Sequence, residues 1–215
     1  MILLVGGEKG GTGKTTVVTN LAAMRDKETS DVLLIDTDKQ GSASAWASVR
    51  DENKDVKRVA CVQKFGSSIG KEIRSLSEKY SDILIDAGGQ NSQELRASMV
   101  VADKMYIPIQ AGQFDVWTLG LMDQLVSQVK ILNPQLEVRV LINRASTNPS
   151  MTEIEDVFQV MSEFENLQIS SAILKERVSY RKAAKEGSSV VELVKQDGKA
   201  SDEIQFLYNE IYKAV

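Results

Sequence analysis

Short apolar runs alternate along this chain with longer segments in which apolar residues recur at helical spacing. The runs predict strands near residues 2–7, 32–36, 58–62, 83–86, 104–109, 137–142 and 167–173. Several of them, including residues 33–35 and 83–85, are continuously apolar, which is typical of parallel strands buried on both faces. Such strands need helices above and below them. The pattern therefore predicts an α/β fold, with a mostly parallel twisted sheet and helices on both faces.

Polar residues follow several of these strands directly. Glu8, Asp36, Asp86 and Asn143 each stand at or just after the carboxyl end of a predicted strand. Right-handed crossover connections bring the carboxyl ends of parallel strands to one edge of the sheet, and ligands of open α/β sheets bind at that edge. We therefore expect these four residues to belong to one site.

A glycine-rich loop follows the first predicted strand, where residues 8–16 read E-K-G-G-T-G-K-T-T. Its glycines let the backbone turn tightly and present N–H groups to phosphate oxygens, and the next helix presents its positive dipole end to the same anion. By the pattern G-x-x-x-x-G-K-[ST], Lys14 reaches the β- and γ-phosphates and the Thr15 hydroxyl binds Mg²⁺ directly. The predicted nucleotide-binding residues of this loop are Lys9, Gly10, Gly11, Thr12, Gly13, Lys14, Thr15 and Thr16.

The loop departs from the general pattern at its start. Glu8 stands where the first glycine belongs, and Lys9 directly precedes the glycine pair. The sequence thereby resembles the deviant Walker A loop, K-G-G-x-G-K-[ST], of the ParA/MinD family of dimerising ATPases. In that family the first lysine crosses a dimer interface to the nucleotide of the other subunit. The resemblance implies a homodimer around two ATP molecules, with Lys9 and Lys14 as catalytic residues. The alternative for Lys9 is a surface lysine at a helix entry.

Two further segments resemble the switch regions of the same family. Residues 36–41, D-T-D-K-Q-G, match its D-x-D-P-Q switch I except that Lys39 replaces the proline. A carboxylate near Mg²⁺ can hold a metal-bound water, and a second one can orient the water that attacks the γ-phosphate. We assign these roles to Asp36 and Asp38, which makes Asp38 catalytic. A turn with helix-capping carboxylates is the alternative interpretation.

Residues 82–89, D-I-L-I-D-A-G-G, resemble a Walker B strand that runs into switch II. In this interpretation Asp86 accepts hydrogen bonds from Mg²⁺-bound waters and from Thr15. Gly88 and Gly89 would let the loop move with the state of the γ-phosphate. A strand followed by an ordinary glycine turn would leave the same pattern.

Asn143 and two aromatic residues complete the candidate contacts. Asn143 follows an apolar strand at the position where related P-loop proteins recognise the base, and an amide can pair with adenine; a cap before a turn is the alternative. Phe114 and Trp117 lie at helical spacing within residues 113–119. They fit either core packing or a dimer contact.

The composition limits the number of domains and the kinds of chemistry that the chain can support. The 215 residues, 42% of them hydrophobic, predict one domain covering 1–215. The net charge of −4 does not indicate a nucleic-acid-binding protein, although a local basic patch can still bind DNA. Cys61 is the only cysteine, which excludes an internal disulfide and a cysteine-ligated cluster within one chain, and the absence of histidine excludes imidazole chemistry.

The resemblance implies a small ParA-type partition ATPase without an N-terminal helix-turn-helix domain. Such a protein uses ATP and Mg²⁺, dimerises with ATP, binds DNA non-specifically and hydrolyses ATP slowly. A centromere-binding or cargo adaptor protein stimulates the hydrolysis, and the cargo is a plasmid, a chromosome or another body. With neither a basic leader nor a membrane-length apolar run, we expect a cytoplasmic, nucleoid-associated protein of a bacterium or archaeon.

Other functions of P-loop proteins have different requirements. A MinD-like ATPase that cycles on a membrane or protein scaffold should end in a basic amphipathic helix. Residues 201–215 do place Ile204, Leu207, Ile211 and Val215 at helical spacing, but acidic residues outnumber the single Lys213, which predicts a helix docked on the core and no membrane anchor. A nitrogenase-type reductase would need paired cysteines. A P-loop metabolic enzyme remains a further alternative.

A basic stripe is predicted near the C-terminus. If the segment after Arg177 is helical, Arg177, Arg181 and Lys185 recur every four residues, with Lys182 beside them. One stripe can follow one phosphate backbone, and two copies in an ATP dimer would double the phosphates neutralised. The four residues are therefore the predicted DNA-binding set. The alternative is a solvated helix face whose charge is diluted by neighbouring glutamates.

Overall fold

The computed structural model describes residues 1–88, 92–113, 116–148 and 153–213. Within these ranges a single sheet is formed by seven strands: β1 (Ile2–Val5), β2 (Val32–Asp36), β3 (Ala60–Gln63), β4 (Asp82–Asp86), β5 (Lys104–Ile109), β6 (Glu137–Ala145) and β7 (Gln168–Lys175). All neighbouring strands are parallel, in the order β3-β2-β4-β1-β5-β6-β7. The predicted α/β fold with a parallel sheet is confirmed.

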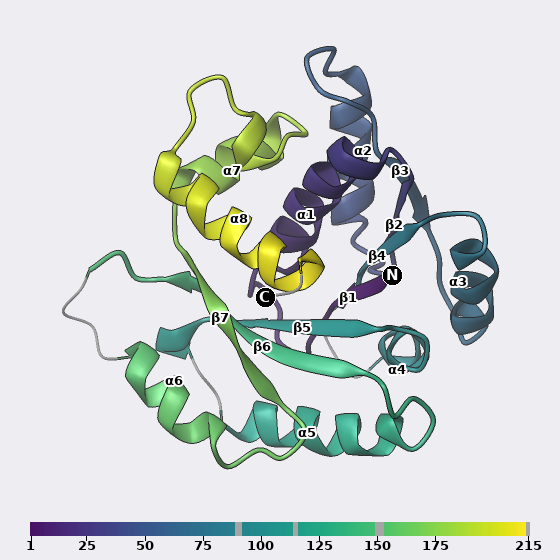
Figure 1. Ribbon diagram of the computed structural model, residues 1–215, viewed down its shortest axis with the longest axis vertical. Coiled ribbons are helices and arrows are strands. Elements are labelled where there is room, and N and C mark those ends of the chain that lie inside the picture. The colour runs from purple at the N-terminus through teal and green to yellow at the C-terminus, as the bar shows by residue number, and fades with distance from the viewer. Residues whose placement is uncertain (89–91, 114–115, 149–152, 214–215) are drawn as a thin grey trace.

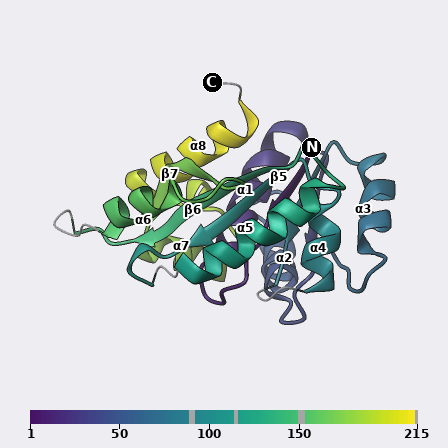
Figure 2. The ribbon, with the colours of Figure 1, turned by 90° about the horizontal axis from the view of Figure 1, so that it is seen from below.

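Helices cover both faces of this sheet (Figures 1 and 2). One face carries α1 (Lys14–Thr29), α2 (Ser42–Glu52), α7 (Val178–Lys185) and α8 (Gly198–Tyr212), with the 3-10 turn η2 (Val190–Glu192) between the last two. The other face carries α3 (Ile69–Ser77), α4 (Gln93–Met99), α5 (Val116–Lys130) and α6 (Glu153–Met161), with the 3-10 turn η1 (Ala111–Gln113) before α5. Each face buries its own hydrophobic layer.

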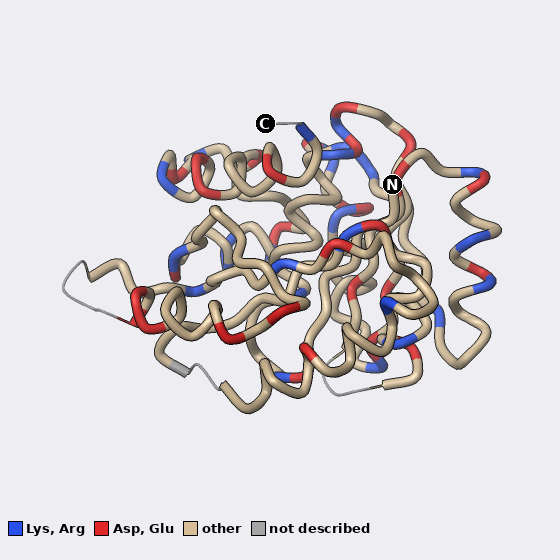
Figure 3. Tube along the Cα trace, turned by 60° about the horizontal axis from the view of Figure 1, so that its bottom comes forward, with Lys and Arg blue, Asp and Glu red and all other residues tan. Residues whose placement is uncertain are grey.

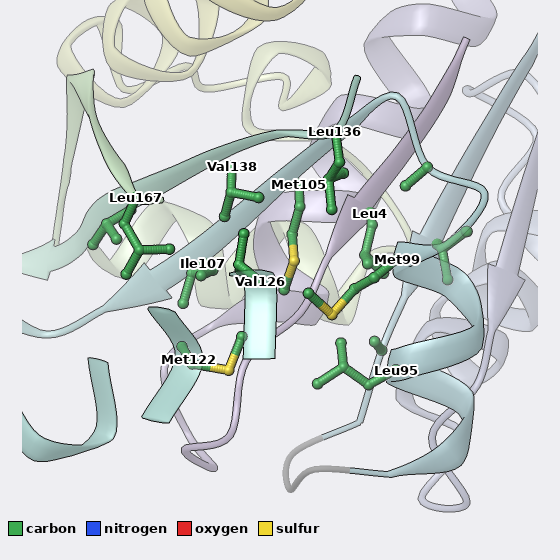
Figure 4. Packing of buried hydrophobic residues seen from close by; sticks show 14 of the residues in the cluster. Leu4, Leu95, Met99, Met105, Ile107, Met122, Val126, Leu136, Val138 and Leu167 are labelled. Carbon is green, nitrogen blue, oxygen red and sulfur yellow. The ribbon is translucent and has the colours of Figure 1, made fainter. Parts of the chain in front are cut away.

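The alternation of side chains along β1 divides the core into these two layers. Leu3 and Val5 belong to the layer beneath α1 and α8, whereas Leu4 points to the opposite layer, because successive strand residues face opposite sides. Figure 4 shows Leu4 packed with Met105 of β5 and Met99 of α4. Burying a side chain of this size contributes about 1.5–3 kcal/mol, so the continuous apolar strands supply much of the stability of the fold.

Several strand ends differ from the sequence prediction by one to three residues, and two of these differences, in β3 and β6, are described here. β3 begins at Ala60, after the exposed Arg58. β6 continues past Ile142 to Ala145, because β7 pairs with it as far as the partners Ala145 and Lys175. The polar pair at 143–144 suggested the end of the strand in the sequence. In the structure both residues still lie within β6, and Asn143 has a buried side chain.

The chain order places β1 at a topological switch point. β1 lies between β4 and β5, and the chain leaves it toward β2 on one side and later returns to build β5, β6 and β7 on the other. Ligands of open α/β sheets bind in the crevice at such a point, outside the carboxyl ends of the strands. The glycine-rich loop follows β1 directly and therefore lies at this crevice.

The last helix docks on the core, as the sequence predicted. Ile204, Leu207 and Ile211 of α8 are buried against the α1 layer, while Val215 lies outside the described residues. Within the part of the chain that the structure describes, no helix is both long and apolar enough to cross a membrane.

A buried ion pair ties α2 to the segment after α7. The Arg50 side chain is only 1% exposed, and its Nη1 and Nη2 atoms each lie 2.8 Å from a carboxylate oxygen of Glu192. Nη1 also donates to the Gly187 carbonyl at 2.9 Å. Burial alone would raise the pKa of Glu192, but hydrogen bonds from Arg50 and from the Ser189 N–H outweigh it and hold that pKa below its usual value.

Glu192→Gln should lower the free energy of unfolding by about 3 kcal/mol at pH 7, because it leaves the Arg50 charge buried without its counter-charge. The folded state lowers the Glu192 pKa, so the ion pair stabilises above the unfolded value of about 4.3 and its contribution is lost as the pH falls further. The difference between wild type and variant should therefore shrink below about pH 4 in denaturant titrations. Glu186→Gln, which removes an exposed partner of Lys182, is the control and should cost less than about 1 kcal/mol.

Candidate functional site

The glycine-rich loop adopts the conformation that a phosphate-binding loop requires. Gly11 and Gly13 have φ angles of 76° and 89°, a left-handed backbone that other residues rarely adopt. α1 begins at Lys14, with Gly13 as its cap residue. The N-terminus of α1 therefore opens toward the crevice, where its unpaired N–H groups and positive dipole end attract an anion.

Three side chains from the ends of β5 and β6 hold the carbonyl groups of this loop. Asn143 donates from Nδ2 to the Thr12 carbonyl at 2.7 Å. Gln110 and Arg144 both donate to the Gly11 carbonyl at 2.9 Å. We call Gln110, Asn143 and Arg144 the carbonyl clamp. The sequence analysis did not identify Gln110 or Arg144, although both stand at strand ends on the predicted ligand edge.

Arg144 takes up an unusual backbone conformation to reach the loop. Its φ angle is 54°, which is uncommon for a residue with a side chain. Its guanidinium also forms an ion pair with Glu176, just after β7. This ion pair raises the pKa of Arg144. A strained residue at a candidate site is consistent with a functional constraint on that position.

Asp86 and Thr15 form the centre of the candidate metal site. The Thr15 hydroxyl donates to Oδ2 of Asp86 at 2.6 Å, which is the predicted contact. The Asp86 carbonyl accepts from both the N–H and the hydroxyl of Thr37, at 2.9 and 3.1 Å. Burial raises the pKa of Asp86 to about 7, although Thr15 and Lys14 act in the opposite direction. A divalent cation would stabilise the charged form of such a buried carboxylate.

Switch I is held by its own first carboxylate. Asp36 is fully buried and accepts the N–H groups of Asp38 at 3.0 Å and of Ser44 at 2.9 Å. Asp38 in turn accepts from the Gln40 N–H at 2.9 Å. Its carboxyl group packs against Gly88, where an added Cβ would lie only 3.2 Å away. Switch I and the start of switch II are therefore in direct contact.

Lys39, which replaces the family proline, lies on the exposed side of switch I. Its charge acts on Glu94 in the first turn of α4 and contributes to the lowered pKa of that carboxyl, whose largest cause is the hydrogen bond from the Gly66 N–H. Gly89, the second glycine predicted for switch II, lies outside the described residues.

The available ligands suit Mg²⁺. They are the Thr15 hydroxyl and, through water, the carboxylates of Asp36 and Asp86, all of them oxygen donors. Among the described residues no group of three or more acidic, cysteine or histidine side chains could enclose a metal ion by itself. Mg²⁺ at a phosphate-binding loop needs no such group, because it keeps several waters and takes substrate phosphates as ligands.

Lys14 connects the loop with these carboxylates. Its ammonium group is buried and donates to the Lys9 carbonyl at 2.8 Å. Burial lowers the pKa of Lys14, and the charges of Asp86 and Asp38 oppose that shift. A phosphate placed beside this ammonium would supply the counter-charge that favours the protonated lysine.

A cavity of about 280 Å³ opens on the opposite side of the loop. It is lined by Gly13, Thr16, Asn143, Arg144, Lys175, Glu176, Arg177, Tyr180, Arg181 and Ala184. The carboxylates lie toward β4 and β2, whereas this cavity lies toward β6 and β7. A nucleotide with its phosphates on the loop and its metal beside Asp86 would extend its base in this direction. Asn143 lines this cavity, and one N–H of its amide is already donated to the Thr12 carbonyl.

The sequence pattern of the CobQ/CobB/MinD/ParA nucleotide binding domain matches residues 3–190. That range contains the phosphate-binding loop, both carboxylate segments and the carbonyl clamp. The chain belongs to this family. The predicted resemblance to ParA/MinD proteins is thereby confirmed.

Three relatives illustrate the range of this family. Maintenance of carboxysome distribution protein A of Halothiobacillus neapolitanus is 24% identical over 97% of this chain and 95% of its own length. A Borrelia burgdorferi protein assigned to plasmid partition, solved with the ATP analogue AMPPNP, aligns with a TM-score of 0.72 at 19% identity and covers 99% of both chains. The septum site-determining protein MinD of Pyrococcus horikoshii, complexed with Mg-ADP, aligns with a TM-score of 0.70 at 17% identity over 99% of this chain and 96% of its own.

At these identities the solved relatives show the fold, which is the predicted P-loop architecture. Their ligands, an ATP analogue and Mg-ADP, agree with the predicted cofactors ATP and Mg²⁺. The metal-ligand and base-contact roles assigned to individual residues stay predictions. The geometry does bring the predicted residues of the loop, Asp36, Asp38, Asp86 and Asn143 to one edge of the sheet.

The structure excludes one of the two alternatives for Trp117 and corrects the predicted place of Arg177. Trp117 is 76% exposed at the start of α5, so it does not pack in the core; a dimer contact stays a prediction, and Phe114 lies outside the described residues. Arg177 precedes α7 as its cap residue and pairs with Glu203 of α8, with Nη2 and Oε1 2.5 Å apart and only 14% of its side chain exposed. Arg177 therefore does not belong to an exposed stripe.

The rest of the basic stripe is present on α7. Arg181, Lys182 and Lys185 are exposed on this helix, which forms where the sequence predicted it. Lys182 lies 3.9 Å from Glu186, a weak exposed pair. Figure 3 shows Lys and Arg interspersed with Asp and Glu along the chain, so any DNA-binding surface would be local.

Proposed function

We propose that this protein is a ParA-type ATPase that positions a cargo by ATP-gated dimerisation and non-specific DNA binding. The observation that carries the proposal is the combination of a deviant phosphate-binding loop, with Lys9 before its glycine pair, and the bond between Thr15 and Asp86 beside it. Membership of the family supports nucleotide hydrolysis. The slow rate and its stimulation by a partner protein belong to the proposal.

The residues of the site have distinct roles in this proposal. Lys14 and the loop N–H groups bind the phosphates, and the Thr15 hydroxyl together with waters held by Asp36 and Asp86 binds Mg²⁺. When bound, Mg²⁺ neutralises charge that develops on the phosphates during transfer. Asp38 accepts a hydrogen bond from the attacking water and orients it toward the γ-phosphate. Its contact with Gly88 makes that position sensitive to movement of switch II.

Lys9 has its role in the dimer. It lies at the rim of the loop and lines a small cavity together with Thr118 and Leu119 of α5. The exposed Trp117 belongs to the same end of α5. We propose that this edge of the molecule contacts a second copy and that Lys9 reaches the nucleotide bound to that copy. Dimerisation then depends on bound ATP.

The class of cargo is proposed from the relatives and not from the surface of this molecule. The relatives named above act on carboxysome distribution, plasmid partition and septum placement, and all three names describe positioning. We propose a cargo body linked to this ATPase by a centromere-binding or cargo adaptor protein that stimulates hydrolysis. The docking of α8 on the core disfavours a membrane-cycling mechanism that depends on that helix.

ATP or AMPPNP with Mg²⁺ should convert the protein from monomer to dimer, and GTP should not, because the base contact of Asn143 is assigned to adenine. Light scattering coupled to size exclusion measures the mass with each nucleotide. Lys14→Ala should abolish nucleotide binding, whereas Lys71→Ala, an exposed lysine on α3, should behave as wild type. A protein that stays monomeric with AMPPNP contradicts the dimer, and an equal response to GTP contradicts the role of Asn143.

Asp38→Ala and Lys9→Ala should separate hydrolysis from dimerisation. Without its water-orienting carboxylate, Asp38→Ala should lose about 100-fold or more in ATPase rate and accumulate as an ATP dimer. Lys9→Ala should instead raise the dimer dissociation constant at least about tenfold, because a charged contact across the interface is lost. Phosphate release and sedimentation measure the two effects, with the exposed Asp55→Ala as control. Normal hydrolysis by Asp38→Ala would move the catalytic assignment to Asp36.

The ATP dimer should bind random-sequence DNA through α7, with no base preference. Lys182→Glu with Lys185→Glu removes two cations per subunit, so the slope of log affinity against log salt should fall by about 3 to 4 in the dimer. Arg181 is left unchanged here because it also lines the cavity beside the loop. Lys71→Glu with Arg74→Glu on α3 is the charge-matched control. An unchanged salt slope in the α7 variant would mean that α7 is a solvated surface and that an adaptor supplies the DNA contact.

A further inference from the structure

The cavity beside the phosphate-binding loop is bordered by an unusual number of cations. Arg144, Lys175, Arg177 and Arg181 all line it, against the single acidic residue Glu176. Its volume of about 280 Å³ is close to the lower end of small-molecule sites, which begin at roughly 300 Å³. The position of the cavity suits the base of a nucleotide, and a neutral base does not require four positive charges. The three arginines among these cations differ in their partners.

Two of the arginines are committed to other partners. Arg144 is held by the Gly11 carbonyl and by Glu176. Arg177 is held by both carboxylate oxygens of Glu203, at 2.5 and 3.2 Å. Neither guanidinium can turn toward a ligand without breaking an ion pair. Arg181 differs, because it is exposed and makes no hydrogen bond or ion pair with the part of the chain that the structure describes.

The geometry of α7 directs Arg181 to the cavity and its neighbours elsewhere. Arg177, Arg181 and Ala184 line the cavity with Tyr180, whereas Lys182 and Lys185 do not. Tyr180 and Ala183 are buried beneath the helix and fix its rotation. Arg181 therefore borders the same cavity as Gly13 and Asn143.

We propose that Arg181 stacks its guanidinium on the base of the bound nucleotide and is a base-binding residue of this site. The guanidinium is planar and weakly hydrated, so it stacks on aromatic faces, which the compact ammonium of lysine cannot do. Asn143 contacts the edge of the base and Arg181 covers its face. The inference rests on the proposed function in that the ligand is ATP.

One consequence concerns the basic stripe. A nucleotide that holds Arg181 against its base withdraws this charge from DNA and leaves Lys182 and Lys185 to contact phosphates. In this proposal Arg181 on one side of α7 contacts the base, and Lys182 and Lys185 on the other side contact DNA.

The test is nucleotide affinity measured by calorimetry on the monomer, with two probes that differ only in the nucleoside. Arg181→Ala should weaken ATP binding about fivefold, the equivalent of about 1 kcal/mol for an exposed cation–π contact. It should change binding of inorganic tripolyphosphate with Mg²⁺ less than twofold. Arg181→Lys, which keeps the charge but not the plane, should resemble Arg181→Ala. Lys71→Ala removes an equal charge from the exposed surface of α3 and should leave both affinities unchanged.

Three results would overturn the proposal: unchanged ATP affinity in Arg181→Ala, an equal loss for ATP and tripolyphosphate, or full affinity in Arg181→Lys. The last two would assign Arg181 a purely electrostatic effect. If Arg181→Ala weakens ATP binding but the wild-type protein never dimerises with ATP, the base contact stands and the proposed partition function is contradicted. A wild-type protein that binds no ATP would overturn both.

Discussion

Peptide groups that turn their N–H toward a bound phosphate turn their carbonyl the other way, and a carbonyl facing the protein interior needs a donor. In this molecule the donors are the carbonyl clamp residues Gln110, Asn143 and Arg144, which bind Gly11 and Thr12. The sheet order makes this possible, because β5 lies beside β1 and β6 beside β5. The clamp holds these loop carbonyls in place, and the start of α1 and the position of Lys14 depend on the loop.

Acidic side chains gather on the side of the loop opposite the carbonyl clamp. Asp36, Asp38 and Asp86 meet at the ends of β2 and β4, and Lys14 is the nearby cation whose charge lowers the Asp86 pKa. The raised pKa of Asp86 shows that burial disfavours its charge in the free protein. A ligand that brings a divalent cation relieves that unfavourable burial, and ligand binding to the folded state stabilises it by mass action.

The helices that follow the phosphate-binding loop and switch I converge on one segment, residues 188–192. α1 follows the phosphate-binding loop, and its Asn20 accepts hydrogen bonds from the Ser189 hydroxyl and the Val190 N–H at 2.9 and 2.8 Å. α2 follows switch I, and its Trp46 donates to the Ser188 carbonyl at 3.2 Å, one turn before the Arg50 and Glu192 pair. This segment directly continues α7. The basic helix is thus connected through packed and hydrogen-bonded groups to both loops.

The sequence by itself determined the features that depend on neighbours along the chain. Short continuous apolar runs are typical of buried strands, and glycines before a lysine and a threonine are typical of an anion-binding turn. Asp36 and Asp86 end their strands because the apolar runs end there. Each of these signals is local, so periodicity and turn chemistry were sufficient. The boundary of β6 was missed because its polar residues remain in the strand by pairing with β7.

Only the tertiary structure decided which distant side chains meet. The packing of α8 on β7 brings Glu203 to Arg177 and removes that arginine from the basic stripe. The rotation of α7 places Arg181 on the cavity that Asn143 also lines, and the packing of α5 leaves Trp117 exposed. Helical spacing gives the relative positions of residues on one helix, but it does not fix how that helix is rotated against its neighbours. That rotation depends on side-chain packing between elements that are far apart in the sequence.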